Sequence, residues 1–363
     1  MTTRLFPLIG LIATLLVGSV SHADVLGKPR PTPLAGVNFP AATQWFGSAD
    51  GVPLGVAVRT ERGMTLAFID GREILLDRFA TIVVAEEAGG FVTFTPEGGQ
   101  VAEDWTLTFY DRDGKQLQRY FDRFGWSRVV VSGDGRTVAV AGLITPAGEG
   151  AAREQRRTAG LVLYDGTGKP LADSELPPGS RITAMTADAG GELIAVALEL
   201  ADRKTDARWL LRVYQRSGKE AFAVKLRQPV QGLRFASDRR ALLLLVPGGM
   251  RVLDLETREP AAIIRLPAGH YIADSGRVFL HAGKLFAVTE QPAAGKEGMS
   301  TWSLLAADVN AAELKPIAEG DDVPSRRSPA LSRSPALGAK EWPALISTDR
   351  IVFIDPGPGV EKQ

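Results

Sequence analysis

Short strand-like runs that recur at regular intervals predict an all-β fold for this chain, in the form of a seven-bladed β-propeller. Gly, Pro and Asp separate these runs, and almost no stretch shows the periodicity of a helix. Seven runs end alike, and their last residues are Asp70, Asp111, Asp165, Gln215, Asp254, Asp308 and Asp355. The intervals are 41, 54, 50, 39, 54 and 47 residues. A repeat of this length, with four short strands in each unit, is typical of propeller blades.

The register of the repeat is clearest in the middle of the chain. A Tyr stands near the end of a strand, a Gly follows four residues later in a turn, and an Asp lies 24 residues after the Tyr. These residues are Tyr110, Gly114 and Asp134, then Tyr164, Gly168 and Asp188, then Tyr214, Gly218 and Asp238. A register that is held three times indicates one structural unit repeated along the chain.

One unit illustrates the four antiparallel strands expected in each blade. Asp134 and Gly135 predict a hairpin turn between the first two strands, because Asp–Gly accepts the positive φ of such turns. The second strand is apolar on both faces, as expected for a sheet packed between two neighbours. The four predicted strands are residues 127–132, 137–143, 160–165 and 170–175.

Residues 1–23 have the features of a secretory signal peptide. Arg4 is positive, a mostly apolar run of about 16 residues follows, and Ser21 and Ala23 precede the expected cleavage before Asp24. The alternative is an uncleaved membrane anchor, but the run is short for a span of roughly 20 residues. We therefore expect a mature protein in the periplasm, with no stable membrane insertion.

The rest of the chain divides into a leader, a single domain and a tail. Residues 24–33 form a Pro-rich leader, and residues 34–355 form the propeller. Residues 356–363 are a tail too rich in Pro and Gly to add a strand to the last blade. Residues 34–39, in turn, have no blade of their own. We expect this N-terminal strand to complete the last blade and close the ring, because pairing removes an exposed edge.

The composition excludes several classes of protein. There is no Cys, which excludes disulfides, thiolate metal sites and a lipid-modified N-terminal Cys. Lys and Arg equal Asp and Glu in number, so nothing indicates a nucleic-acid partner. After residue 23 only His270 and His281 remain, without the spacing of metal ligands. We expect no metal, no cofactor and no catalytic residue.

Acidic residues leave two alternatives open. Residues 111–114 (DRDG) alternate acids as a calcium loop does, but no Glu follows to complete the ligand set. We interpret this segment as a hairpin turn with two solvated Asp. A pair of acids drawn from different blades, as in a glycosidase, stays open at this level.

Three Trp recur at one place in alternate units. Trp105, Trp209 and Trp302 each lie six residues before the residue that ends a third strand. In a propeller, the loops between second and third strands share one face with the loops that join blades; we call this the insertion-bearing face. The Trp side chains either form an aromatic arc that holds a partner or pack between blades. The other candidate binding residues on this face are Trp126, Arg153, Arg156, Arg157, Arg208, His270 and Tyr271.

The units resemble the WD40-like and pyrroloquinoline-quinone-like (PQQ-like) repeats of secreted bacterial propellers. The resemblance depends on the Tyr-Asp-x-x-Gly-Lys turn and on the Ser-x-Asp-Gly hairpin that follows it. WD40 repeats carry a Gly-His pair and a terminal Trp-Asp, whereas here Gly269-His270 occurs once and Trp-Asp is missing. Quinoprotein repeats carry a Trp in the outer strand, and the matching residues 116–121, 170–175 and 220–225 have none. The resemblance therefore implies the fold but not quinone binding.

These observations predict a non-catalytic propeller that binds or scaffolds another periplasmic or envelope protein through its insertion-bearing face. The alternative is an enzyme, a hydrolase or lyase acting on a sugar or lactone in the central funnel. A quinone-dependent dehydrogenase ranks third. An enzyme requires converging polar groups at the axis, whereas a scaffold requires only an exposed patch with apolar and Arg side chains.

Overall fold

The computed structural model describes the strand-forming parts of the chain between residues 30 and 353. The described residues are 30–31, 42–47, 53–60, 63–68, 73–76, 80–85, 90–96, 105–144, 158–201, 208–236, 239–260, 263–273, 275–281, 283–324, 330–333, 343–346 and 350–353. The predicted signal peptide (residues 1–23), closing strand (residues 34–39) and tail (residues 356–363) lie outside them. Within the described ranges, no helix is long and apolar enough to cross a membrane.

The strands form antiparallel sheets, and most of these sheets have four strands, as the sequence predicts. The first contains β2 (Ala42–Gly47), β3 (Pro53–Thr60), β4 (Gly63–Phe68) and β5 (Glu73–Leu76). Another contains β13 (Arg181–Ala187), β14 (Leu193–Glu199), β15 (Trp209–Gln215) and β16 (Glu220–Leu226). The next contains β17 (Gly232–Phe235), β18 (Ala241–Val246), β19 (Gly249–Asp254) and β20 (Ile264–Arg265). A short 3₁₀ helix, η2 (Ser275–Arg277), precedes the sheet of β21 (Val278–His281), β22 (Lys284–Pro292), β23 (Met299–Asp308) and β24 (Lys315–Pro324).

One sheet has seven strands because a single long strand belongs to two four-stranded units. Its order is β12-β11-β10-β9-β8-β7-β6. The long strand β9 (Gln116–Val131) pairs with β8 through its first part and with β10 through its second part. Phe124 pairs with both Trp105 and Ile144. The other members are β6 (Thr81–Val84), β7 (Phe91–Pro96), β8 (Trp105–Tyr110), β10 (Thr137–Ile144), β11 (Thr158–Asp165) and β12 (Pro170–Glu175).

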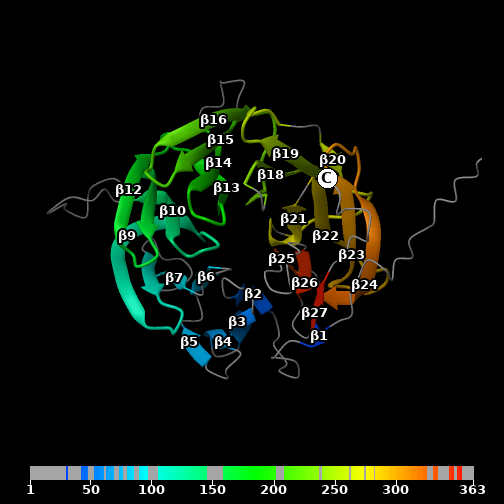
Figure 1. Ribbon diagram of the computed structural model, residues 1–363, viewed down its shortest axis with the longest axis horizontal. Helices are drawn as coiled ribbons and strands as arrows, with labels where there is room; N and C mark the ends of the chain where they lie inside the picture. The colour runs from blue at the N-terminus through cyan, green and yellow to red at the C-terminus, as the bar shows by residue number, and fades with distance from the viewer. Residues whose placement is uncertain are drawn as a thin grey trace, which may run out of the picture.

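The sheets stand around a central axis, each with its first strand near the centre and its last at the periphery (Figure 1). The innermost strands of successive four-stranded units contact one another. For example, β13 contacts both β9, whose second part begins a unit, and β17. Four-stranded antiparallel sheets arranged radially in this way make a β-propeller. The predicted fold class is confirmed to this extent.

The remaining sheet combines the two ends of the described chain. It contains β25 (Ala330–Arg333), β26 (Pro343–Ile346), β27 (Arg350–Phe353) and, at its edge, β1 (Arg30–Pro31). Arg30 pairs with Ile351 and Pro31 with Arg350, in antiparallel register. This N-terminal pairing lies upstream of residues 34–39, inside the segment expected to be a leader.

The second strand β14 forms part of the core because both of its faces are covered. In β14, Ala195 and Ala197 pack with the β17–β19 side, together with Leu244. Ile194 and Val196, on the alternate face, pack against the preceding unit. All four β14 residues are at most 1% exposed. The prediction of second strands that are apolar on both faces is therefore confirmed for this strand.

The repeated Asp and Gly residues have separate structural tasks in the turn between third and fourth strands. Asp165 Oδ1 accepts hydrogen bonds from the backbone N–H groups of Thr167 (2.9 Å) and Lys169 (3.0 Å). Burial alone would raise the pKa of the Asp165 carboxyl, but a 2.7 Å hydrogen bond from the Thr167 hydroxyl, together with these two backbone bonds, outweighs it and holds the pKa below its ordinary value. Asp111 accepts equivalent bonds from Asp113 and Lys115, so the DRDG segment is a capped turn.

The repeated Gly lies against the outer strand of the preceding unit. Gly168 has φ +94°, and its carbonyl accepts a 2.6 Å hydrogen bond from the Tyr120 hydroxyl in β9. Gly218 has φ +80°, and its carbonyl accepts a 2.7 Å hydrogen bond from Ser174 in β12. The Tyr-Asp-x-x-Gly-Lys pattern therefore specifies a turn, and the Gly of that turn accepts a hydrogen bond from the preceding blade.

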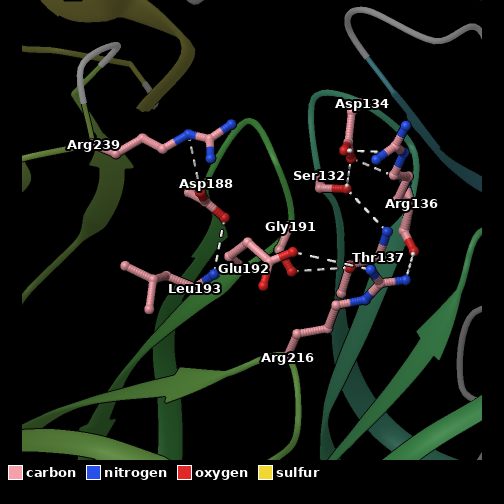
Figure 2. Close-up of polar contacts among 10 residues, drawn as sticks. All are labelled: Ser132, Asp134, Arg136, Thr137, Asp188, Gly191, Glu192, Leu193, Arg216 and Arg239. Carbon is pink, nitrogen blue, oxygen red and sulfur yellow. Dashed lines mark hydrogen bonds and ion pairs between the residues drawn. The ribbon is translucent and has the colours of Figure 1, made fainter.

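The hairpins between first and second strands also join successive units (Figure 2). Ser132 Oγ donates to Asp134 Oδ1 (2.7 Å) and accepts from the Thr137 backbone N–H (3.0 Å). Across the blade boundary, Thr137 Oγ1 donates to the Gly191 carbonyl (3.0 Å), and the Asp134 backbone N–H donates to the Ala189 carbonyl (2.8 Å). Figure 2 shows these two hairpins side by side, with their turns at the same end.

One equivalence drawn from the sequence is wrong by two residues. Asp188 matches Asp134 by its distance from the preceding Tyr, but in space it takes the place of Ser132. Its carboxylate accepts the N–H of Leu193, five residues on, as Ser132 accepts that of Thr137. The segment leading from β12 to this hairpin is longer than the corresponding part of β9, which has no loop because its two halves form one strand.

Candidate functional site

The insertion-bearing face contains the three repeated Trp, and each is half-buried at or near the start of a third strand. Trp105 stacks on Phe94, with 4.7 Å between ring centroids and 15° between planes. Trp209 packs against the cluster that includes Leu211 and Leu226. Within the described ranges, no ring contact joins the three Trp to one another.

Trp302 shows most directly why packing explains these residues. Its ring lies over Gly320 in the neighbouring strand β24, at a point where a Cβ on Gly320 would be 1.9 Å from the ring. The ring also packs with Leu304 and Ala318. Of the two alternatives left by the sequence, the described contacts of the Trp side chains agree with packing within and between strands.

A charged group surrounds Trp209 at this face. Arg208 and Arg181 each donate a hydrogen bond to the Glu199 carboxylate, with Nε–Oε distances of 2.9 Å and 3.0 Å. Hydrogen bonds from Arg181 first, and from Arg208 second, lower the pKa of the Glu199 carboxyl. The Arg208 guanidinium lies 5.3 Å from the Trp209 ring centroid. Of this group, sequence reasoning found Arg208 and Trp209 but missed Arg181 and Glu199.

The missed pair could have been found from strand register. Glu199 ends β14, and it is directly opposite Arg181 in β13 and Trp209 in β15. Cross-strand neighbours with opposite charges commonly interact. The register between β13 and β14 depends on the hairpin of residues 188–193. The sequence comparison matches this hairpin to residues 134–139, two residues away from its true equivalent.

His270 and Tyr271 are anchored to the β22 strand rather than projecting freely. Tyr271 pairs with Glu290 through two 2.9 Å backbone hydrogen bonds, and its hydroxyl donates to Glu290 Oε2 (2.8 Å). His270 Nδ1 lies 2.8 Å from Thr289 Oγ1. Thr289 and Glu290 are fully buried. These two predicted binding residues therefore secure the loop that joins β20 to β21.

The His270 contact predicts a dependence of stability on pH. Burial lowers the pKa of His270 from its ordinary 6.5, and the Glu319 carboxylate only partly offsets this. A lowered folded pKa means that the unfolded chain binds more protons, so the contribution is complete above pH 6.5 and is lost as the pH falls through the folded pKa. Between pH 7.5 and pH 5, the melting temperature of the natural protein should fall about 1–2 °C more than that of His270→Gln. Equal falls in thermal melts would contradict the assignment.

A cavity of about 290 Å³ opens beside the inner half of β9, near the insertion-bearing face. It lies where Trp105 begins β8 and where Ser127 and Arg128 begin the part of β9 that pairs with β10. Sequence reasoning missed Ser127 and Arg128, although both directly follow the predicted Trp126. The residues that line the cavity are Thr81, Phe94, Trp105, Ser127, Arg128, Val129, Val130 and Met185.

Four further predicted binding residues are Trp126, Arg153, Arg156 and Arg157. Trp126 lies in β9. Arg153, Arg156 and Arg157 lie outside the described residues. In the part of the chain that the structure describes, no three side chains of His, Asp or Glu are grouped as metal ligands.

Comparison with known proteins identifies a fold and no family. No protein-family model matches the sequence, and no curated protein matches it. A chain of the solved mitotic checkpoint complex is similar with a TM-score of 0.50 and 12% identity, over 98% of this chain and 99% of that one. The β-propeller domain of Cps50 (Swd1) from Myceliophteria thermophila has a TM-score of 0.48 and 14% identity, over 86% and 96%. The likeness concerns the fold alone: the chain is a β-propeller that resembles WD40 propellers.

Proposed function

We propose that this protein is a non-catalytic periplasmic β-propeller that binds another protein of the cell envelope through its insertion-bearing face. The observation that carries this proposal is the contrast between the two rims of the ring. At the rim of the short turns, the repeated Asp carboxylates accept hydrogen bonds from their own turns. At the insertion-bearing rim, charged and aromatic groups stand exposed or half-exposed.

At the short-turn rim, the repeated Asp residues at the ends of the third strands bond to their own turns. The carboxylates of Asp111, Asp165 and Asp254 each accept two backbone N–H groups of their own turns. Ser132 and Thr137 bond within and between hairpins. These groups stabilise turns and blade contacts, which is a structural task.

The insertion-bearing rim has the composition of an interface. The side chains of Arg181 and Arg208 are 64% and 46% exposed, although both contact Glu199. Trp209 lies beneath Arg208 at the same place. Arg and aromatic residues are enriched where proteins bind one another. The similar chain of the mitotic checkpoint complex also belongs to a protein assembly, and we carry that kind of partner into the proposal.

The ring that presents this face should have seven blades. The seven-stranded sheet counts as two blades that share β9, and the other sheets supply one each. We infer that β1, as the outer strand beside β27, closes the ring, because pairing of the chain ends removes an exposed edge. A periplasmic location follows from the signal-like residues 1–23.

Site-specific photo-crosslinking in the cells that make this protein tests the proposal. A benzoylphenylalanine at position 227, in the exposed loop between β16 and β17, should give a covalent adduct with an envelope protein. The matched control replaces Arg112, which is also exposed but lies in the turn of residues 111–115 on the opposite rim. Adducts from position 112 alone, or equal adducts from both positions, would contradict the choice of face. Adducts with cytoplasmic proteins only would contradict the compartment.

A further inference from the structure

We propose that the cavity beside the inner half of β9 binds a carboxylate side chain of an acidic segment in the protein partner, with Arg128 as the charged anchor. The inference rests on the proposed function, and it specifies the chemistry that the insertion-bearing face recognises. Three observations on different residues carry it.

The first observation is that Arg128 has no acidic partner. By contrast, three arginines of the neighbouring unit have acidic partners: Arg181 and Arg208 share Glu199, and Arg212 lies 3.3 Å from Glu220. No hydrogen bond or ion pair involves the Arg128 side chain in the described structure. Burial first, and the positive charge of Arg181 second, lower the pKa of Arg128. A cation that lines a cavity and has no acidic partner among the described residues is a site that an anion would stabilise.

The second observation is that two donors of the cavity lining lack partners. The Trp105 Nε1–H and the Ser127 hydroxyl are both buried and make no hydrogen bond in the described structure. Nearly all buried polar groups in proteins are hydrogen-bonded, so two orphaned donors on one cavity call for an explanation. Both groups and the guanidinium can donate to oxygen, and a carboxylate offers two acceptor oxygens.

The third observation is the shape and chemistry of the space. About 290 Å³ is at the small end of ligand pockets, enough for one or two side chains. Its apolar lining comes from Phe94, Val129, Val130 and Met185, and no Asp or Glu is among the described residues that line it. An apolar wall beside a single cation suits the methylene stem and carboxylate of Glu. The zero net charge of the chain argues against a nucleic-acid phosphate.

Arg128 stabilises the described structure through no ion pair. Arg128→Gln removes a charge and breaks no ion pair among the described residues. It should therefore leave the melting temperature unchanged or raise it slightly.

Fluorescence anisotropy with a labelled hexaglutamate peptide tests the proposal directly, and a hexaglutamine peptide is the matched probe. The natural protein should bind hexaglutamate at least tenfold more tightly than hexaglutamine. Arg128→Gln should weaken hexaglutamate binding about tenfold, and Arg128→Lys, which keeps the charge without the planar fork, should weaken it less. Arg112→Gln, which makes the same change of charge on the opposite rim, should have no effect.

Three outcomes would overturn the inference. Equal binding of the two peptides would exclude recognition of the carboxylate. If Arg128→Gln and Arg112→Gln weaken hexaglutamate binding equally, then the net charge of the protein, and not Arg128, determines the affinity. Binding of inorganic phosphate or acetate at Arg128 without binding of the peptide would identify a small-anion site instead. The same crosslinking experiment separates this inference from the proposed function. If Arg128→Gln does not reduce the adducts from position 227, then the insertion-bearing face is the interface but the cavity is not where the partner is anchored.

Discussion

Gly191→Ala should destabilise the protein by about 2–5 kcal/mol, because the change adds a steric clash to an unfavourable backbone conformation. Gly191 has φ +70°, a region that costs an L-residue roughly 1–2 kcal/mol. A Cβ there would lie 2.5 Å from Thr137 Oγ1 and 3.0 Å from Ser132 Oγ. Both residues are fully buried, so they cannot move aside freely, and overpacking costs about 1–3 kcal/mol more.

Gly248→Ala is the matched control for this prediction. Gly248 has φ +78°, but nothing lies within 4 Å of its Cβ position. It should lose only the backbone term, about 1–2 kcal/mol. Urea denaturation of both variants measures the difference. If the two variants lose the same free energy of unfolding, then the contact between the hairpins of residues 132–137 and 188–193 is not tight.

Arg239→Ala should cost about 2–3 kcal/mol because it leaves a buried carboxylate without its cation. Arg239 Nε lies 3.3 Å from Asp188 Oδ2, and the Asp188 side chain is 1% exposed (Figure 2). The contact has the distance of an ion pair but not the geometry of a hydrogen bond, since Oδ2 has no hydrogen-bonded partner. Breaking a fully buried ion pair costs about 3–5 kcal/mol. We expect a cost at or just below the lower end of this range, because the Arg239 side chain is 47% exposed and water can reach the carboxylate once it is removed.

The neighbouring unit suggests how this loss can be recovered. Arg239 has φ +60°, where the equivalent turns have Gly135 and Gly191, so Arg239→Gly should cost about 1 kcal/mol less than Arg239→Ala. Asp188→Ser would recreate the hydroxyl of Ser132, which accepts the same backbone N–H. The double variant Asp188→Ser/Arg239→Gly should therefore be more stable than Arg239→Gly alone. If chemical denaturation shows it to be less stable, then Asp188 does more than satisfy Leu193 and Arg239.

Features that depend on a few neighbouring residues could be predicted from the sequence. The strands that the sequence expects at residues 137–143, 160–165 and 170–175 agree with β10, β11 and β12 to within two residues at each end. The turn Asp residues were interpreted as structural, and each caps its own turn through bonds that span at most four residues. Local geometry of this kind is written in short patterns because the partners are close along the chain.

The candidate site depended on contacts that short patterns do not contain. Trp302 packs because Gly320, eighteen residues later, leaves room for its ring. Arg181 and Arg208 contact Glu199 because a strand register brings all three together. Arg128 was missed because its distinction is the lack of an acidic partner in space, which no spacing along the chain records.

The sequence by itself determined the all-β class, the four-stranded unit and the turns, because hydrophobic alternation and turn chemistry act over a few residues. Only the tertiary structure decided which repeated residues clamp one blade to the next, that β9 runs unbroken through two units, and that Asp188 takes the place of Ser132. It also placed Arg128 at the edge of a cavity without an acidic partner among the described residues. The physical reason is that packing and electrostatic pairing act between residues tens of positions apart, so a local signal cannot specify them.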